Sequence, residues 1–260
     1  MIPIKTSEEI EIMRVGGKIL SQVLKEVARQ VRPGISTLEL NQKAEELIDK
    51  FGVEPAFKGY KAKSNQPGYP FALCTSVNQE LVHGLPSNRI LKDGDMIGLD
   101  LGIKYQGFYL DAALTVPVGR VSREIKKLIK VTKKSLDLAI KKIKSGIYLA
   151  EISKTIQDYA EKNGFSAVRQ LTGHGIGREL HEEPAIYDYL LPEWKKNPES
   201  SPKLSAGMCL AIEPMVTAGG WQVKTLDDGW TVVSVDSSLA AHFEKTIVVK
   251  KDGAEILTEI

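Results

Sequence analysis

The chain has 260 residues, 42% of them hydrophobic and 26% charged, which is typical of a globular protein with one large domain or two small ones. Its 35 Lys and Arg residues against 33 Asp and Glu give a net charge of +2, which disfavours nucleic acid as a specific partner. The chain begins without a signal-peptide pattern and has no apolar run of about 18 residues, so we expect neither export nor a membrane partner. Two cysteines, Cys74 and Cys209, are too few to cross-link such a domain, and we expect reduced thiols and a cytoplasmic location.

Four helices are predicted from capping boxes, from the helical spacing of apolar residues and from the glycines that end them. They run from Thr6 to a stop at Pro33-Gly34, from Ser36 to Gly52, over 122–145 and over 149–163. The second pair repeats the first at a constant offset of 112 residues, which carries Gly34 onto Gly146. We therefore predict a single domain over 1–260 made of two similar halves, about 1–120 and 121–260, that pack face to face.

Strand-like runs follow each helix pair and predict an α+β fold, with a site between the two halves. The expected strands lie within 71–77, 96–118, 209–216, 231–235 and 244–249. Two stretches rich in Gly, Pro, Ser, Asn and Lys, at 61–70 and 192–202, are expected to be surface loops.

The run 95–114 has the pattern of a β-hairpin with an aspartate on each strand. With Tyr105 and Gln106 as the two loop residues, Asp100 would lie directly opposite Asp111, whereas a three-residue loop would shift the register by one. Two opposed carboxylates destabilise a sheet unless a cation lies between them or one is protonated. Two unrelated, solvated aspartates are the alternative.

Three further residues complete a candidate metal-binding set. His174 lies in a glycine-dense turn, GHGIG, which would bring the backbone close to a ligand. Glu213 and Glu244 stand within or at the start of apolar strands, where acids need partners. With Asp100 and Asp111 they give four carboxylates and one imidazole, which suit two divalent cations better than one tetrahedral zinc. Structural ion pairs with Lys or Arg are the alternative for each residue, and no nucleophile elbow or phosphate loop is present.

Six motifs in a fixed order make the chain resemble the type I methionine aminopeptidases, in the short bacterial form of peptidase family M24. They are NQELVHGLP at 78–86, Asp100 with Asp111, GHGIG at 173–177, HEEP at 181–184, IEPM at 212–215 and EKTIVV at 244–249. The resemblance extends from the first helix to Val249. It implies the pita-bread fold, in which two pseudo-symmetric α/β halves with antiparallel sheet enclose a dinuclear metal site.

The resemblance also implies the ligands and the chemistry of the site. The five metal ligands would be Asp100, Asp111, His174, Glu213 and Glu244, and the cofactors two divalent ions: Co, Mn, Fe or Zn. Asp111 and Glu244 would bridge both ions, the bridging water would be the nucleophile, and Glu213 would be its general base. His181 would contact the substrate near the scissile carbonyl, and His83 near the scissile amide or the free amine.

A small apolar pocket for the methionine side chain is implied as well. Tyr60, Tyr69, Cys74 and Trp230 occupy the matching positions, with ordinary core packing as the alternative for the aromatic residues. The chain also departs from its bacterial relatives. Phe57 stands where cysteine is frequent, Leu180 where phenylalanine is frequent, His242 and Lys245 where glutamine and histidine are common, and the loop between Tyr60 and Tyr69 is longer.

The implied activity is metal-dependent removal of the initiator methionine from nascent chains when the next residue is small and uncharged. The enzyme would be a monomer that takes the N-terminal methionine of nascent peptides, with contact with the ribosome as a further expectation. Two other hypotheses stay open. An X-Pro peptidase of the same fold usually carries an additional N-terminal domain, which this chain is expected to lack. A non-catalytic binding module usually lacks one or more of the ligands, whereas all five are present here.

Overall fold

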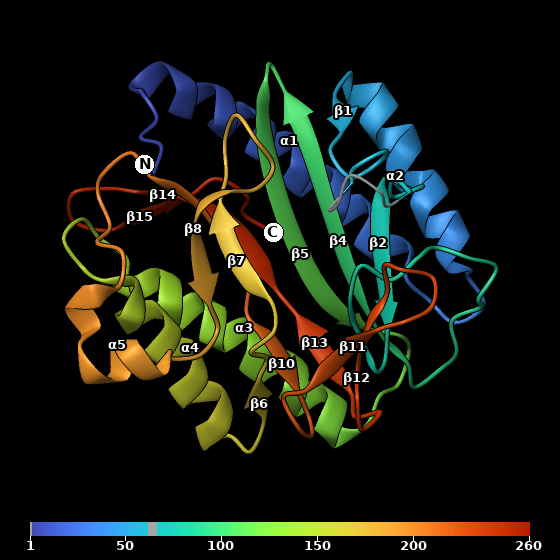
Figure 1. Cartoon of the computed structure of the whole chain (residues 1–260). Helices are drawn as coiled ribbons and strands as arrows, with labels where there is room; N and C mark the ends of the chain where they lie inside the picture. The colour runs from blue at the N-terminus through green and yellow to red at the C-terminus, as the bar shows by residue number, and fades with distance from the viewer. Residues whose placement is uncertain (1, 62–66) are drawn as a thin grey trace.

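A computed structural model of the chain describes residues 2–61 and 67–260, and Figure 1 shows how its helices and strands are arranged. Its main sheet has nine antiparallel strands, and two three-stranded sheets accompany it. This mixture of helices and antiparallel sheet confirms the predicted α+β class. The expected surface loop at 61–70 falls in part on residues 62–66, which lie outside the described residues.

All four predicted helices are present, and the capping boxes begin the first two. Thr6 and Ser36 each accept a hydrogen bond from the backbone of a glutamate three residues on, whose side chain bonds back to the cap. Gly52 ends the second helix in the left-handed conformation, with φ of 65°. The helices are α1 (Ser7–Gln30), α2 (Thr37–Phe51), α3 (Arg123–Lys142), α4 (Leu149–Lys162) and a short α5 (Pro192–Lys196).

The prediction of a surface loop over 192–202 is wrong in part. The stretch holds α5 and a 3₁₀ turn, η1 (Pro198–Ser200). Pro192 opens α5, where its missing N–H costs no helical hydrogen bond. Trp194 is 7% exposed and packs into the core that residues of α3 and α4 form, so one buried aromatic side chain fixes the segment.

Each of the five predicted strand runs contains at least one strand. The missed strands are two to six residues long, too short for a clear alternation of apolar and polar residues. The strands are β1 (Glu54–Pro55), β2 (Leu73–Val77), β3 (Glu80–Val82), β4 (Met96–Tyr105), β5 (Phe108–Pro117), β6 (Ser166–Ala167), β7 (Thr172–Gly175), β8 (Glu182–Tyr187), β9 (Cys209–Ile212), β10 (Met215–Thr217), β11 (Val223–Thr225), β12 (Val232–Ser234), β13 (Ala240–His242), β14 (Glu244–Val249) and β15 (Ala254–Ile256).

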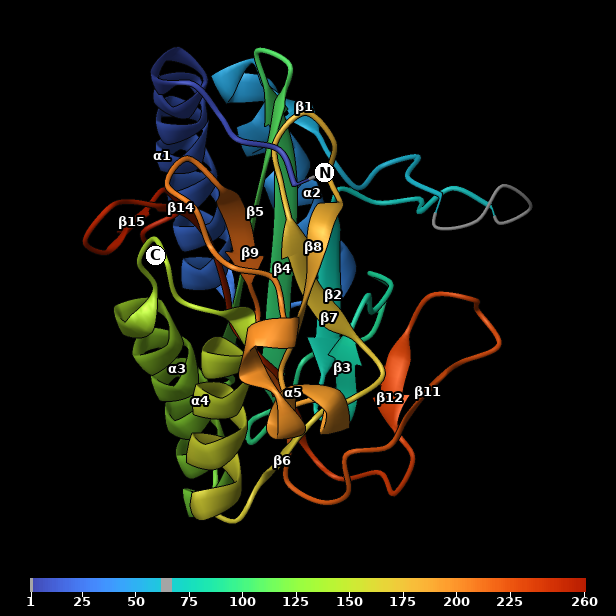
Figure 2. The ribbon, with the colours of Figure 1, turned by 60° about the vertical axis from the view of Figure 1, so that its left-hand side comes forward.

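Helices cover one face of the main sheet and leave the other accessible. Figure 2 shows α1, α3 and α4 on the same side of that sheet, with β11 and β12 on the opposite side. One core joins α1 and α2 to β2, β4 and β5, and a second joins α3 and α4 to β9 and β14. The division of a single domain into halves at about residue 120 stays a prediction. None of the described helices has the length and apolar character needed to cross a membrane.

The register of the β4–β5 hairpin differs from the predicted one. The loop residues are Gln106 and Gly107, both with positive φ (47° and 87°), and not the predicted Tyr105 and Gln106. A two-residue hairpin turn with left-handed backbone at both positions favours glycine at the second, which draws Gly107 into the loop. Asp100 is therefore opposite Ala113, and Asp111 is opposite Gly102.

The direct opposition of the two aspartates is thus a wrong prediction, although both stay on one face of the sheet. The register is shifted by two residues, and side chains alternate with a period of two, so the shift exchanges no faces. Asp100 and Asp111 are diagonal neighbours on adjacent strands.

His174 lies on a strand and not in the predicted turn. It belongs to β7, which pairs with β9 through His174 and Ala211 and with β8 across an irregularity between Gly173 and Gly175. A Cβ atom on Gly173 would lie 2.5 Å from the carbonyl oxygen of Ala211, and one on Gly175 would lie 2.2 Å from that of Glu183. The glycines of the motif allow neighbouring strands to approach His174 closely.

Candidate metal site and substrate cavity

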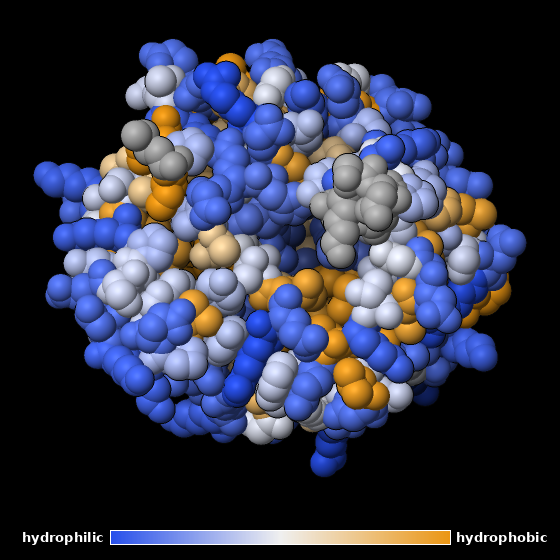
Figure 3. Space-filling view, viewed as in Figure 1, coloured by the Kyte–Doolittle hydropathy of each residue, from blue (hydrophilic) through white to orange (hydrophobic). Residues whose placement is uncertain are grey.

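A cavity of about 980 Å³ opens on the accessible side of the main sheet. Figure 3 shows a hollow near the centre of this face, bordered by both hydrophilic and hydrophobic residues. All the site residues predicted from the sequence line this cavity: Tyr60, Tyr69, Cys74, His83, Asp100, Asp111, His174, His181, Glu213, Trp230 and Glu244. The structure therefore brings together residues that lie far apart in the sequence.

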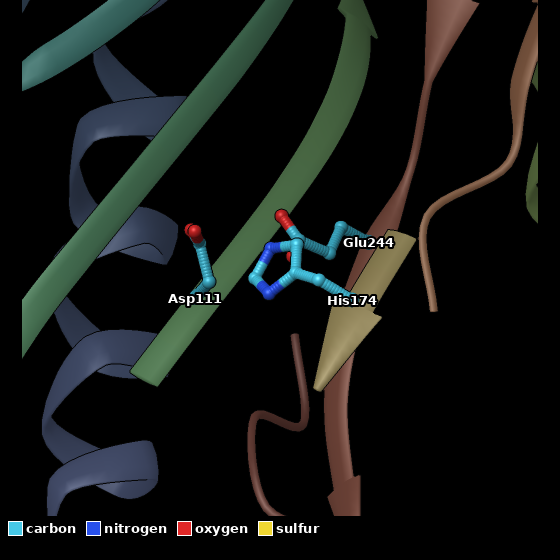
Figure 4. Close-up of side chains that lie close together, drawn as sticks. All are labelled: Asp111, His174 and Glu244. Atoms are coloured by element: carbon cyan, nitrogen blue, oxygen red, sulfur yellow. The ribbon is translucent and has the colours of Figure 1, made fainter. Parts of the chain in front are cut away.

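Three side chains form a compact cluster in this cavity. Asp111 projects from β5, His174 from β7 and Glu244 from β14, and one potential ligand atom of each lies within 4.8 Å of the others. Figure 4 shows the three side chains entering the same space from different strands. All three residues are buried, so the main sheet fixes their positions.

The other two predicted ligands lie beside this cluster. Asp100 is on β4, the neighbour of β5, and is close enough to raise the pKa of Asp111 by charge repulsion. Glu213 follows the end of β9, and its Oε1 lies 3.5 Å from Nε2 of His174. Pro214 comes next and donates no backbone hydrogen bond, which is consistent with the break between β9 and β10.

The pKa of each of the four carboxyl groups is raised, chiefly by burial. Desolvation is the largest cause for Asp100, Asp111, Glu213 and Glu244, and repulsion from the other acids adds to it for all but Glu213. Among the described residues, none of these acids forms an ion pair with Lys or Arg. The alternative of structural ion pairs therefore finds no support in the described part of the chain.

The donor set fits divalent cations. Oδ1 of Asp100 and Oε1 of Glu244 are buried acceptors without a hydrogen-bond partner in the described structure. Buried carboxylate oxygens are costly unless they are paired, and a cation would satisfy both of them. Carboxylate and imidazole donors are those that Co, Mn, Fe and Zn accept in proteins.

His174 is prepared to act as a neutral ligand. Burial is the main cause that lowers its pKa to about 3. Its Nδ1 lies 2.8 Å from the carbonyl oxygen of Gly175, which can only accept, so we assign the ring proton to Nδ1. Nε2 is then left with its lone pair directed toward the acidic cluster, as a metal-binding histidine requires.

Thr246 anchors Asp111 and was missed by the sequence analysis. Its hydroxyl accepts a hydrogen bond from the backbone N–H of Asp111 at 3.0 Å and donates one to the backbone carbonyl at 2.8 Å. The pair links β14 to β5 next to the candidate ligands. A threonine inside an apolar strand was the only available signal, and it does not indicate which residue the hydroxyl contacts.

The two predicted substrate histidines face the cavity. His181 is the last residue of the β7–β8 loop, and its Nδ1 lies 2.8 Å from the hydroxyl of Tyr60. The ring of His181 also lies against that of His174, with 4.3 Å between the ring centres. His83 follows β3 with a left-handed φ of 58°. Burial by the cavity walls lowers the pKa of both, and for His83 repulsion from His242 and His181 lowers it further.

An aromatic wall bounds the apolar end of the cavity. Tyr69 and Trp230 pack edge to face, with 5.2 Å between ring centres and 82° between planes. The Tyr69 hydroxyl donates to the carbonyl oxygens of Leu73 or Gly84, at 3.2 and 3.0 Å, which fixes the ring. Cys74 pairs with Asp100 in the sheet, and burial raises the pKa of its thiol, so it presents a neutral surface.

The departures from the bacterial pattern fall into two groups. Phe57 and Leu180 line the cavity and so contribute to the shape of its wall. Lys245 lies away from it, with Nζ 3.1 Å from Oε1 of Glu259. His242, by contrast, is buried in contact with Glu213. The long loop between Tyr60 and Tyr69 lies in part outside the described residues.

Comparison with known proteins gives a consistent picture. The model of metallopeptidase family M24 matches residues 11–251. The chain is 48% identical to the methionine aminopeptidase of Clostridium perfringens over 260 residues, which is 100% of both proteins. It is 47% identical to methionine aminopeptidase 1 of Bacillus subtilis, again over 100% of both.

Solved structures share the fold. The crystal structure of methionine aminopeptidase from Thermotoga maritima superposes with a TM-score of 0.93 at 46% identity and covers 100% of both chains. The prolidase from Pyrococcus furiosus superposes with a TM-score of 0.77 at 23% identity, over 99% of this chain and 65% of the prolidase. The prolidase likeness concerns the fold alone. The predicted pita-bread fold and the resemblance drawn from the six motifs are confirmed.

Proposed function

The chain belongs to metallopeptidase family M24, and on that premise we propose that it removes the N-terminal methionine of nascent proteins when the second residue is small and uncharged. Metal-dependent methionine aminopeptidase activity follows from the family and from its full-length relatives. One observation carries the finer proposal. A buried cluster of acidic residues and histidine lies in the same cavity as an aromatic, apolar wall.

The five residues of the acidic cluster would hold two divalent cations: Asp100, Asp111, His174, Glu213 and Glu244. When bound, the ions would lower the pKa of water and polarise the scissile carbonyl, whichever of Co, Mn, Fe or Zn is used. Asp111 and Glu244 each offer a ligand atom to the compact part of this cluster and would hold the ions together with the other three residues. The two-ion stoichiometry is part of the proposal.

Proton transfer would fall to Glu213. Its carboxylate lies at the margin of the cluster and is the only one of the four acids that is partly exposed to the cavity. Its pKa is raised by burial, which makes it a better base than a solvated glutamate. We assign to it the removal of the proton from the attacking water and its delivery to the leaving amine.

The two cavity histidines would bind the reacting peptide. We assign the Tyr60 hydroxyl as the donor to Nδ1 of His181, which leaves the ring proton on Nε2, where it can be donated to the scissile carbonyl oxygen as negative charge develops. His83 would bind the scissile amide or the free amine. The unbranched methionine side chain would lie against Tyr69, Cys74 and Trp230.

The remaining expectations stay part of the proposal. Because its substrates are nascent chains, the enzyme would act in the cytoplasm, and contact with the ribosome would bring it to them. We propose a monomer, since the cavity takes all its predicted residues from one chain. X-Pro peptidases share the fold, so that hypothesis stays open. The binding-module hypothesis is disfavoured because all five candidate ligands line the same cavity.

Peptide hydrolysis tests the proposal directly. We would measure methionine release from Met-Ala-Ser, Met-Pro-Ser and Met-Lys-Ser, and leucine release from Leu-Ala-Ser, after chelation and with added Co²⁺ or Mn²⁺. The expected result is metal-dependent cleavage of Met-Ala-Ser, with Met-Lys-Ser and Leu-Ala-Ser nearly untouched. Cleavage of the Met-Pro peptide alone would favour an X-Pro peptidase. No cleavage with any metal would favour a binding module.

A further inference from the structure

Lys5 is a buried lysine in the segment that precedes α1. Its Nζ forms an ion pair with Oε2 of Glu182, and the two side chains are only 3% and 7% exposed. Lysine is rarely buried, and a charge removed from solvent needs a partner of this kind. The pair lies outside the candidate metal ligands, and nothing in the proposed chemistry uses it.

Glu182 uses its second oxygen to hold the β7–β8 loop. Oε1 accepts hydrogen bonds from the backbone N–H groups of Arg178, at 2.7 Å, and Glu179, at 3.3 Å. One carboxylate thus joins the N-terminal segment to the backbone of the loop. Gly177 makes room for the lysine, because a Cβ atom there would lie 2.1 Å from Cε of Lys5.

The loop held in this way carries cavity residues. Leu180 and His181 follow directly after the two bonded amides, and both line the cavity. Among the described strands, β8 is the last of the main path and pairs only with β7. The start of the loop is held to the sheet by two backbone hydrogen bonds, from Tyr109 to the carbonyl oxygen of Gly177 at 2.7 Å and from Ile176 to that of Cys209 at 3.1 Å, and Glu182 holds the part that follows. Figure 2 shows the start of the chain beside this hairpin.

The N-terminal segment is itself fixed to the sheet. The backbone N–H of Lys5 donates to the carbonyl oxygen of Gly207 at 2.9 Å, and that of Gly207 donates to Val249 on β14 at 2.9 Å. Lys5 therefore connects the loop of this hairpin to the strand that carries Glu244. The connection runs through one buried charge pair.

We propose that Lys5, through Glu182, is a positioning residue for His181. The ion pair and the two amide hydrogen bonds hold the β7–β8 loop so that the imidazole faces the reacting centre. This inference rests on the proposed function for its catalytic readout. It predicts that loss of the lysine charge loosens the loop while the metal cluster, on β4, β5, β7, β9 and β14, is unaffected.

Lys5→Met removes the charge and keeps an unbranched apolar stem. We expect kcat/KM for Met-Ala-Ser to fall by about tenfold or more, mainly through kcat, with unchanged metal content. The matched control is Arg178→Gln, because Arg178 joins the same loop to Glu9 of α1 through an exposed ion pair, with 71% of the arginine side chain accessible. This control should stay within about twofold of the wild type.

A double-mutant cycle with His181→Ala distinguishes an effect of Lys5 on the position of His181 from a general effect on the stability of the protein. If Lys5 acts through His181, then Lys5→Met in the His181→Ala background should reduce activity by less than about twofold further. An undiminished loss in that background would overturn the proposal. If Lys5→Met does not fold, Glu182→Gln takes its place in the cycle, since the amide oxygen can still accept from the loop.

Hydrogen exchange gives a readout that needs no activity. Amides of Arg178 and Glu179 should exchange faster in Lys5→Met than in the wild type, while those of β14 are unchanged. Unchanged exchange in the loop would contradict the inference even if the variant were less active. If the wild type hydrolysed no peptide, the proposed function would fail, and exchange would still decide whether Lys5 holds the loop.

Discussion

Nε2 of His242 lies 3.4 Å from Oε2 of Glu213, on the side of the carboxylate opposite His174. The imidazole is 3% exposed, and its Nε2 is a buried nitrogen without a hydrogen-bond partner among the described residues, with the Glu213 carboxylate beside it at ion-pair distance. Burial lowers the pKa of His242, so the ring is neutral and can donate from only one nitrogen. A neutral ring protonated at Nε2 would direct a single N–H donor toward Glu213 and fix the orientation of its carboxylate.

Replacement of His242 tests this contact. His242→Ala should lower kcat by about tenfold, because a hydrogen bond to a charged group contributes about 1.5–3 kcal/mol. His242→Gln retains an N–H donor of similar reach and should stay within about threefold of the wild type. Steady-state kinetics with metal content measured in parallel checks both variants. Equal losses in the two would show that packing, and not the donor, accounts for the effect.

In the absence of metal, the free energy of unfolding of the protein should fall as the pH rises. The four clustered carboxyl groups have folded-state pKa values above their ordinary values of 3.8 and 4.5. Their contribution to stability is complete below about pH 4 and is lost as the pH rises through the raised values. We expect the Tm of chelated protein to recover on addition of Mn²⁺ at pH 8, because the ions favour the charged form.

Asp111→Asn provides the matched comparison for that experiment. The amide keeps the shape of the side chain and removes one of the repelling charges. Without metal, the variant should therefore be more stable than the wild type by about 1 kcal/mol or more at pH 8, or roughly 2–4 °C in Tm. The difference should vanish near pH 4, where the wild-type carboxyls are protonated. Mn²⁺ should stabilise the variant much less than the wild type.

Features that depend on adjacent residues could be predicted from the sequence, whereas contacts between distant segments could not. Capping residues and glycines gave the ends of α1 and α2, since a helix end depends on three or four adjacent residues. The β4–β5 register depends on which two residues form the turn. The prediction placed Tyr105 in the turn with Gln106, whereas the structure has Gln106 and Gly107 there. Lys5 with Glu182 and Thr246 with Asp111 are separated by more than 100 residues, so no local spacing indicates them.

His174 and His181 should respond differently to substitution, although their rings touch. His174→Ala removes a candidate ligand and should abolish both peptide hydrolysis and part of the metal content, with the fold retained. His181→Ala should lower turnover by about 100-fold or more with full metal content, because it removes a donor to developing charge. Metal analysis beside kinetics distinguishes the two. Full activity of His174→Ala would rule out the ligand assignment, and loss of metal from His181→Ala would contradict its substrate role.

Trp230 should control affinity for the methionine side chain more than the rate of the reaction. Its ring forms the apolar wall with Tyr69 and lies among the cavity residues. Trp230→Leu would remove the edge-to-face contact and widen the pocket, so we expect KM for Met-Ala-Ser to rise by about tenfold with kcat changed less than about threefold. Trp221→Leu is the control, because Trp221 contacts Arg169 and is not part of the cavity lining. A fall in kcat at constant KM would place Trp230 in the chemistry of the reaction instead of in side-chain recognition.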